Sequence, residues 1–244
     1  VCENGTPTLL TVAYTNGTGT PTYQWFSNTV NSTTGGTLIS GATSATFTPP
    51  ANTVGTLYYY CIITLSSGGC SSLNSNIATV TVNPLPSITT QPLLTQNGCV
   101  GVTISALTAS FTGGTGTASY QWFSNTVNSN SGGTLIPGAT NPTYTPPVFT
   151  NPGNYYYYVI INLNGNGCGT TTSAVAEVVI FNDPIITSQP IPTQTLCQSA
   201  LPQTLEITAT GGNGSFSYQW YSNPTNNTTS GTPISGATNS TFIP

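Results

Sequence analysis

A six-residue segment, Tyr-Gln-Trp-Phe-Ser-Asn, occurs at residues 23–28 and again, unchanged, at residues 120–125. Residues 218–223 repeat it with tyrosine in place of phenylalanine. The three tryptophans of the chain mark these repeats and are separated by 97 and 98 residues. A constant period of this length indicates tandem copies of one module, each within the usual size range of a single domain.

The second copy is complete and predicts an all-β module. Short runs of β-branched and aromatic residues alternate with turn signals rich in Gly, Pro, Asn and Ser, and no stretch has helical periodicity. The expected strands are residues 88–91, 102–111, 119–124, 134–136, 143–145, 154–163 and 172–181, with a hairpin turn at 164–167. Seven short strands with closely spaced turns predict a β-sandwich.

Two short proline-containing segments, residues 84–86 and 182–184, stand 98 residues apart and predict the joints between modules. Such joints favour an extended, semi-rigid rod. The first copy lacks an opening strand, and the third ends before its tyrosine-rich strand. We therefore expect the sequence to be a window of a longer array. The predicted modules are residues 1–85, 86–183 and 184–244.

The composition excludes several classes of function. The chain has no Lys, Arg or His, only four acidic residues, and a formal charge of −4. Without cations it cannot neutralise phosphates, so we expect no nucleic-acid partner. Without His or Lys the common nucleophilic mechanisms cannot be assembled, and the four carboxylates form no defensible pair. We predict no enzyme activity, catalytic residue, metal site or cofactor. The longest apolar runs are too short for a membrane span in this window.

The repeats resemble immunoglobulin-type domains. The tryptophan on the third expected strand and the Tyr-Tyr-Tyr-Cys run at residues 58–61 correspond to the Trp and Tyr-x-Cys of that family. The resemblance implies that Trp25, Trp122 and Trp220 pack in the core and that Tyr59 and Tyr157 take the tyrosine-corner role. The chain departs from the family pattern because no cysteine lies on the second strand to pair with Cys61.

A narrower resemblance rests on several short motifs together: Trp-[Phe/Tyr]-Ser-Asn, Ile-x-Gly-Ala-Thr, Thr-Pro-Pro, Tyr-Tyr-Tyr and a late Gly-Cys. In combination they are similar to the Ig-like repeats of very large surface adhesins of Bacteroidota. Those proteins are exported by the type IX secretion system and include gliding-motility adhesins. The resemblance implies an extracellular location on a bacterial cell surface.

The six cysteines follow the module period. Cys2, Cys99 and Cys197 occupy one module position, and Cys70 and Cys168 occupy another. If both positions lie at the same end of a sandwich, each full module closes its own disulfide, which predicts the pairs Cys2–Cys70 and Cys99–Cys168. Disulfides indicate an oxidising, extracytoplasmic compartment. Cys197 is left without a partner. Cys61 is expected to be a buried free thiol at the place of Val159, or else to compete with Cys70 for Cys2.

The tyrosine-rich strands provide the candidate recognition surface. If Tyr59 and Tyr157 point inward, alternation places their neighbours on the outer face. These outer aromatic residues could stack on sugar rings, or they could pack on neighbouring strands and shield the face, which we favour. The residues concerned are Tyr58, Tyr60, Tyr156 and Tyr158.

Two functional hypotheses follow. The first is a non-catalytic structural repeat region, a stalk or fibre of a secreted bacterial adhesin or surface filament, which provides reach and multivalent attachment. The near-identity of the copies, loops included, favours it. The second is a set of carbohydrate-binding modules attached to a secreted hydrolase. The expected partners are the neighbouring modules and, for either hypothesis, surface polysaccharide or other surfaces.

Overall fold

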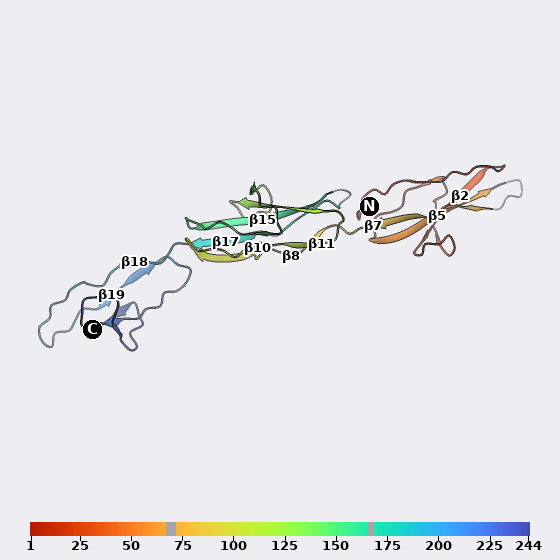
Figure 1. The fold of residues 1–244 in the computed structure, drawn as a ribbon. Coiled ribbons are helices and arrows are strands. Elements are labelled where there is room, and N and C mark those ends of the chain that lie inside the picture. The colour runs from red at the N-terminus through yellow and green to blue at the C-terminus, as the bar shows by residue number, and fades with distance from the viewer. Residues whose placement is uncertain (67–71, 165–167) are drawn as a thin grey trace.

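The structure is a computed structural model that describes residues 1–66, 72–164 and 168–244. Within these residues every regular element is a β-strand, which confirms the all-β prediction. The strands fall into three successive groups that lie one after another in a row, and the N-terminus lies at the end of the first group that faces the second (Figure 1). We call the groups the first module (β1 to β7), the second module (β8 to β17) and the third module (β18 to β23), and each sheet is built from strands of one module.

The second module is a sandwich of one large sheet and two short strand pairs. The large sheet has the order β13-β12-β15-β17-β9, and β16 also pairs with β15. Its strands are β9 (Thr95–Cys99), β12 (Ala118–Asn125), β13 (Thr134–Leu135), β15 (Gly153–Leu163), β16 (Thr170–Thr172) and β17 (Ala176–Phe181). Opposite it, β8 (Ser87–Thr90) pairs with β11 (Ser110–Thr112), and β10 (Leu107–Thr108) pairs with β14 (Thr143–Tyr144).

The core of the second module lies between these layers. Alternate residues of β17 are buried, as the period of two requires for a strand with one face in the core. The fully buried Trp122 stands opposite Val159 in the register of β12 with β15. The cluster around them also contains Ile104, Leu107, Ala109, Phe149, Tyr157, Ile161, Ala176, Val178 and Ile180.

The first module repeats this arrangement with a smaller core. Its larger sheet contains β2 (Pro21–Asn28), β3 (Thr37–Leu38), β5 (Gly55–Leu65), β6 (Leu73–Asn74) and β7 (Ala78–Val82), and β1 (Leu10–Thr11) pairs with β4 (Thr46–Phe47). Trp25 stands opposite Cys61 in the same register that joins Trp122 to Val159. The buried core cluster consists of Trp25, Cys61 and Ile63.

The third module contains three strand pairs. These are β18 (Ile185–Ser188) with β20 (Thr208–Thr210), β19 (Leu205–Glu206) with β23 (Thr241–Phe242), and β21 (Tyr221–Ser222) with β22 (Thr232–Pro233). The described residues contain no strand equivalent to β15 in this module. Trp220 therefore has no facing strand of that kind and remains half-buried.

The structure differs from the expected strands in three places. The strand expected at residues 102–111 begins only at Leu107, and the one expected at 172–181 is divided into β16 and β17. The division occurs at Ser173, whose hydroxyl accepts a hydrogen bond from the Val159 amide and donates one to the Ala174 carbonyl. Residues 165–167 of the expected hairpin turn lie outside the described residues. β9 was not expected, since Thr-Gln-Asn-Gly-Cys has little β-propensity.

Candidate functional site at the module joint

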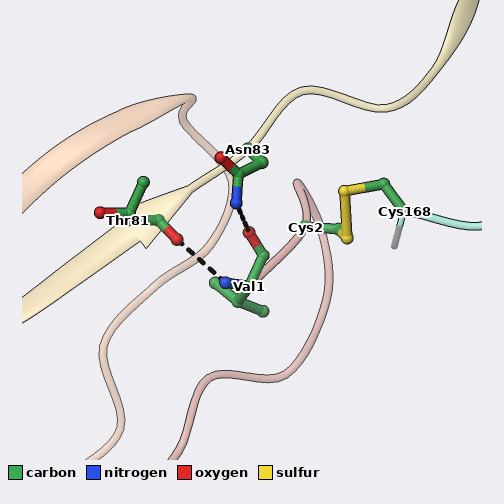
Figure 2. Close-up of a disulfide and its surroundings, with 5 residues drawn as sticks. All are labelled: Val1, Cys2, Thr81, Asn83 and Cys168. Atoms are coloured by element: carbon green, nitrogen blue, oxygen red, sulfur yellow. Dashed lines mark hydrogen bonds between the residues drawn. A yellow bond between two sulfur atoms is a disulfide. The ribbon is translucent and has the colours of Figure 1, made fainter. Parts of the chain in front are cut away.

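A disulfide joins the first module to the second. Cys2 is bonded to Cys168, with the Cα atoms 5.3 Å apart and a sequence separation of 166 residues (Figure 2). Cys168 follows β15 at the end of the second module that faces the first, and its side chain is buried. The bond therefore crosses the joint and does not close a loop within one module.

This bond corrects the predicted pairing. The sequence-based pairs Cys2–Cys70 and Cys99–Cys168 are both wrong, because Cys2 and Cys168 are bonded to each other; Cys70 itself lies outside the described residues. The assumption that both module positions lie at one end of the sandwich fails because β9 runs parallel to β17 and carries Cys99 to the far end, beside Phe181. β15 has 11 residues and separates the two ends by about 35 Å. A disulfide requires Cα atoms within about 7 Å.

The N-terminal segment is held against the last strand of the first module. The Val1 nitrogen donates to the Thr81 carbonyl at 3.0 Å, and the Asn83 amide donates to the Val1 carbonyl at 2.8 Å. Cys2 forms a parallel bridge with Asn83, and the Asn83 side chain also donates to Val1 (Figure 2). These contacts place the Cys2 sulfur at the end of the first module where the linker leaves.

The linker docks on a glycine pair of the second module. The Gly114 amide donates to the Pro84 carbonyl at 2.8 Å. Gly113 has φ of +77°, and a Cβ atom there would lie 2.5 Å from the Leu85 carbonyl oxygen, so only glycine permits this approach. The joint is therefore defined by main-chain contacts in addition to the disulfide.

The second joint repeats this docking. The Gly212 amide donates to the Asn182 carbonyl at 2.7 Å, and a Cβ atom on Gly211 would collide with the Asp183 carbonyl. Gly211 and Gly212 are 98 residues after their counterparts in the second module. This contact was not predicted from the sequence, although two Gly-Gly pairs at the module period are a signal for it.

The three tryptophans have the same local structure. Each indole nitrogen donates to a main-chain carbonyl 19 residues later, at 2.9 Å in every case; the acceptors are Ser44, Asn141 and Asn239. Trp25 and Trp122 are 2% and 0% exposed. Their indole groups are thus buried and bonded to the loop before β4 or β14, and they offer no surface for a ligand.

Tyr59 and Tyr157 are also buried, at 2% and 5% exposure. Burial raises the pKa of both hydroxyls, and for Tyr157 the neighbouring Tyr144 and Tyr155 raise the pKa further. A hydrogen bond of the tyrosine-corner kind is made by Tyr155, whose hydroxyl donates to the Asn151 carbonyl at 3.0 Å. In the second module the corner residue is thus two positions before the one that the family resemblance implied.

Half of the expected recognition surface is covered. Tyr60 and Tyr158 are only 3% and 2% exposed, as expected if the outer aromatic residues pack on neighbouring strands, and these two rings are not available to stack on sugars. The ring of Tyr60 stacks on Phe26 at 5.2 Å, and that of Tyr158 stacks on Phe123 at 5.1 Å. The Gly133 amide donates to the Tyr158 hydroxyl, so the loop before β13 lies over this ring.

The other two outer tyrosines are half-buried. Tyr58 lies opposite Asn28, and Tyr156 lies opposite Asn125, in the same strand register of the two modules. The Asn154 side-chain amide donates to the Tyr156 hydroxyl and to the Glu177 carboxylate, both at 3.4 Å. Tyr58 and Tyr156 therefore leave one partly accessible ring per module, which is too little for a flat aromatic platform.

The remaining cysteines differ in accessibility. Cys61 is an unbonded thiol with no exposed surface, and burial raises its pKa. Cys99 is a partly exposed thiol and Cys197 an exposed one.

Across the described ranges no three Cys, Asp or Glu side chains come together as metal ligands would. The described part of the chain also has no helix that could span a membrane.

Several solved structures of tandem domains align with most of this chain. The titin I-band fragment I67–I69 has 13% sequence identity and a TM-score of 0.42, and the match covers 85% of this chain and 76% of that one. Tandem Ig repeats of Dlar have 16% identity and a TM-score of 0.31, and the match covers 67% of this chain and 84% of that one. Fibronectin(III)-like modules of Clostridium thermocellum CbhA have 18% identity and a TM-score of 0.28, and the match covers 69% of this chain and 80% of that one. The sheet topology itself confirms the all-β, tandem-module arrangement that the sequence predicted.

No curated protein sequence matches the chain. A family model matches it twice, over residues 1–84 and 92–182, and together these segments make up most of its length. The two matched segments correspond to the first and second modules. The chain therefore belongs to the family described as Domain of unknown function (DUF8696).

Proposed function

We propose that this chain is a non-catalytic structural repeat region, a stalk or fibre of a secreted bacterial cell-surface adhesin or surface filament. The observation that carries the proposal is the joint: a disulfide links adjacent modules, and the same main-chain docking recurs at both linkers. Joints of this kind hold modules in line, which is what a spacer requires.

The chemistry of the chain supports an extracellular location. A structural disulfide persists in an oxidising compartment and is rare in a reducing one. The motifs shared with type IX-secreted adhesins of Bacteroidota, including gliding-motility adhesins, support a bacterial cell surface. If each module binds a surface weakly, several modules in one fibre would attach much more strongly than one.

We place the module boundaries of the array within the docked linkers, giving modules at residues 1–85, 86–183 and 184–244. Pro84 and Asn182, whose carbonyls accept the glycine amides, are equivalent residues of the two linkers. A boundary at this point separates the strands without breaking a strand pair.

Small-angle X-ray scattering of the purified, oxidised chain tests the rod. A compact protein of 244 residues would have a radius of gyration of about 18 Å. Three modules in line, each about 37 Å long from the length of β15, form a rod of roughly 110 Å with a radius of gyration of about 32 Å. A value near 18 Å would exclude the stalk.

Two further measurements address location and ligand. Antibodies against the chain should label the outer surface of intact cells that make it. We expect no detectable binding of the chain to a panel of soluble and insoluble polysaccharides, because the rings of Tyr60 and Tyr158 are buried. Saturable polysaccharide binding that is lost in Tyr156→Ala, but kept in the buried-site variant Tyr158→Phe, would favour carbohydrate-binding modules instead.

A further inference from the structure

Cys99 occupies the same place in the second module that Cys2 occupies in the first. Cys2 is bridged in parallel to Asn83, and Cys99 is paired in parallel with Phe181, the equivalent residue one module later. Cys2 is disulfide-bonded to the hairpin cysteine of the following module, whereas Cys99 is an unbonded, partly exposed thiol.

The surroundings of Cys99 match as well. At both joints a glycine amide of the following module donates to the linker carbonyl at the same position, so the following module is presented in the same way. Beside Cys99, at the second joint, an open groove of about 630 Å³ is lined by Val100, Asn151, Asn182, Ile185 and Gly211. At the first joint Cys168, which precedes β16, is bonded to Cys2.

We propose that the Cys2–Cys168 bond is one instance of a repeating linkage, in which the first cysteine of each module bonds to the hairpin cysteine of the next. Cys99 is then the bonding site for the β-hairpin of a completed third module, and this hairpin occupies the groove. Cys197 holds the same position one module further along.

The bond forms by oxidation of two thiols. Each sulfur loses its proton, the S–S bond forms, and the two electrons pass to a disulfide oxidant, either glutathione disulfide or a thiol–disulfide oxidoreductase, which is reduced to two thiols. Cys99 lies between Cys2 and Cys168 in the sequence, so the sequence ranges enclosed by successive disulfides overlap. Each joint of the array is then crossed by a disulfide. The linkage does not depend on whether the array serves as a stalk.

The repeating linkage is tested on a chain lengthened at its C-terminus. Residues 147–183 of the second module are appended after Pro244, because Pro244 is equivalent to Pro146. This supplies the third module with a strand equivalent to β15 and a cysteine equivalent to Cys168. The protein is oxidised in a glutathione buffer, alkylated and digested with chymotrypsin, and linked peptides are identified by mass spectrometry. We expect Cys99 bonded to the appended cysteine, together with Cys2–Cys168.

Two outcomes would overturn the proposal. In the first, the appended cysteine is bonded to Cys197. In the second, the appended cysteine is still a thiol although the Cys2–Cys168 bond is intact and Trp220 is shielded from solvent. Acrylamide quenching of the Trp220 fluorescence, with Trp25 and Trp122 already buried, reports whether the extension has folded. A second variant does not need the extension. In Cys2→Ser of the unextended chain, Cys168 and Cys99 should both remain thiols, and a Cys99–Cys168 peptide would show that pairing lies within modules.

Discussion

Tyr157 and Cys61 show how single side chains of this protein depend on their surroundings. Both lie on the central strand of a large sheet, and neither makes contact with bulk water over more than a small part of its surface. Burial raises the pKa of both groups, which keeps them neutral inside the core at pH 7. Their contribution to stability therefore changes with pH where phenols and thiols ionise.

The prediction at this scale concerns Tyr157. Burial raises the pKa of its hydroxyl above the ordinary value of 10.0. The unfolded chain therefore loses this proton first, so stability is complete below pH 10 and falls as the pH rises above it, by up to about 1.4 kcal/mol per pH unit for this group. Urea unfolding of Tyr157→Phe should show a shallower loss of stability between pH 10 and 11 than the parent.

Each protein is compared with its own midpoint at pH 7, so that any cost of removing the hydroxyl does not enter the slope. Some loss of stability should remain in the variant, because burial also raises the pKa of Tyr59 and Tyr144. Equal slopes for parent and variant would mean that Tyr157 ionises as easily in the folded chain as in the unfolded one.

At the scale of elements, the linker and the glycine pair form a small interface made of main chain. Glycine is required at position 113 for two reasons: the positive φ of Gly113 and the closeness of the Leu85 carbonyl. The first module has Asn16 at the equivalent position, with φ of 61°, which shows that asparagine can adopt the backbone conformation. The close approach to the linker is therefore the stronger of the two requirements.

We predict that Gly113→Ala opens the joint. The left-handed conformation alone costs alanine about 1 kcal/mol, and the overlap with Leu85 adds roughly 1–3 kcal/mol if the linker stays docked. The Gly114 amide should lose its hydrogen bond to Pro84 and exchange its proton much faster, as measured by hydrogen exchange of the surrounding peptide.

Gly132→Ala is the matched control. Gly132 has φ of +71°, but nothing lies within 4 Å of a Cβ atom built there. This variant carries the conformational cost without the overlap, so protection of the Gly114 amide should be unchanged. Equal protection in both alanine variants would show that the linker is not held by the glycine pair.

At the scale of the whole molecule, the disulfide changes how the chain carries load. A force applied to the two ends passes from Cys2 directly to Cys168 and bypasses the sequence between them. The enclosed part includes most of the first two modules. The fibre can therefore lengthen under tension only by the residues outside the bridge, even if the modules inside it lose their strand pairing.

Single-molecule stretching of the oxidised chain from its two ends tests this. The bonded cysteines have a sequence separation of 166, which corresponds to about 580 Å of extended chain at about 3.5 Å per residue. That length should be released only after a reductant is added. The double variant Cys2→Ser with Cys168→Ser should release it in either condition. Full extension of the oxidised parent would contradict a bridge across the joint.

The sequence by itself determined the repeat and the all-β class. These follow from local information: the period of the tryptophan motif and the alternation of apolar residues. The inward position of Trp25, Trp122 and Tyr59 could also be predicted, because large aromatic residues on a half-buried strand gain most by facing the core.

Only the tertiary structure decided which cysteines meet. The pairing depends on β9, a polar strand whose parallel register with β17 is set by contacts distant in sequence and which moves Cys99 one module length away from Cys168. The burial of Tyr60 and Tyr158 depends likewise on a loop that crosses the outer face. Local patterns predict on which face of a strand a residue lies. Which end of the module the residue reaches, and which segments cover it, depend on the assembled chain.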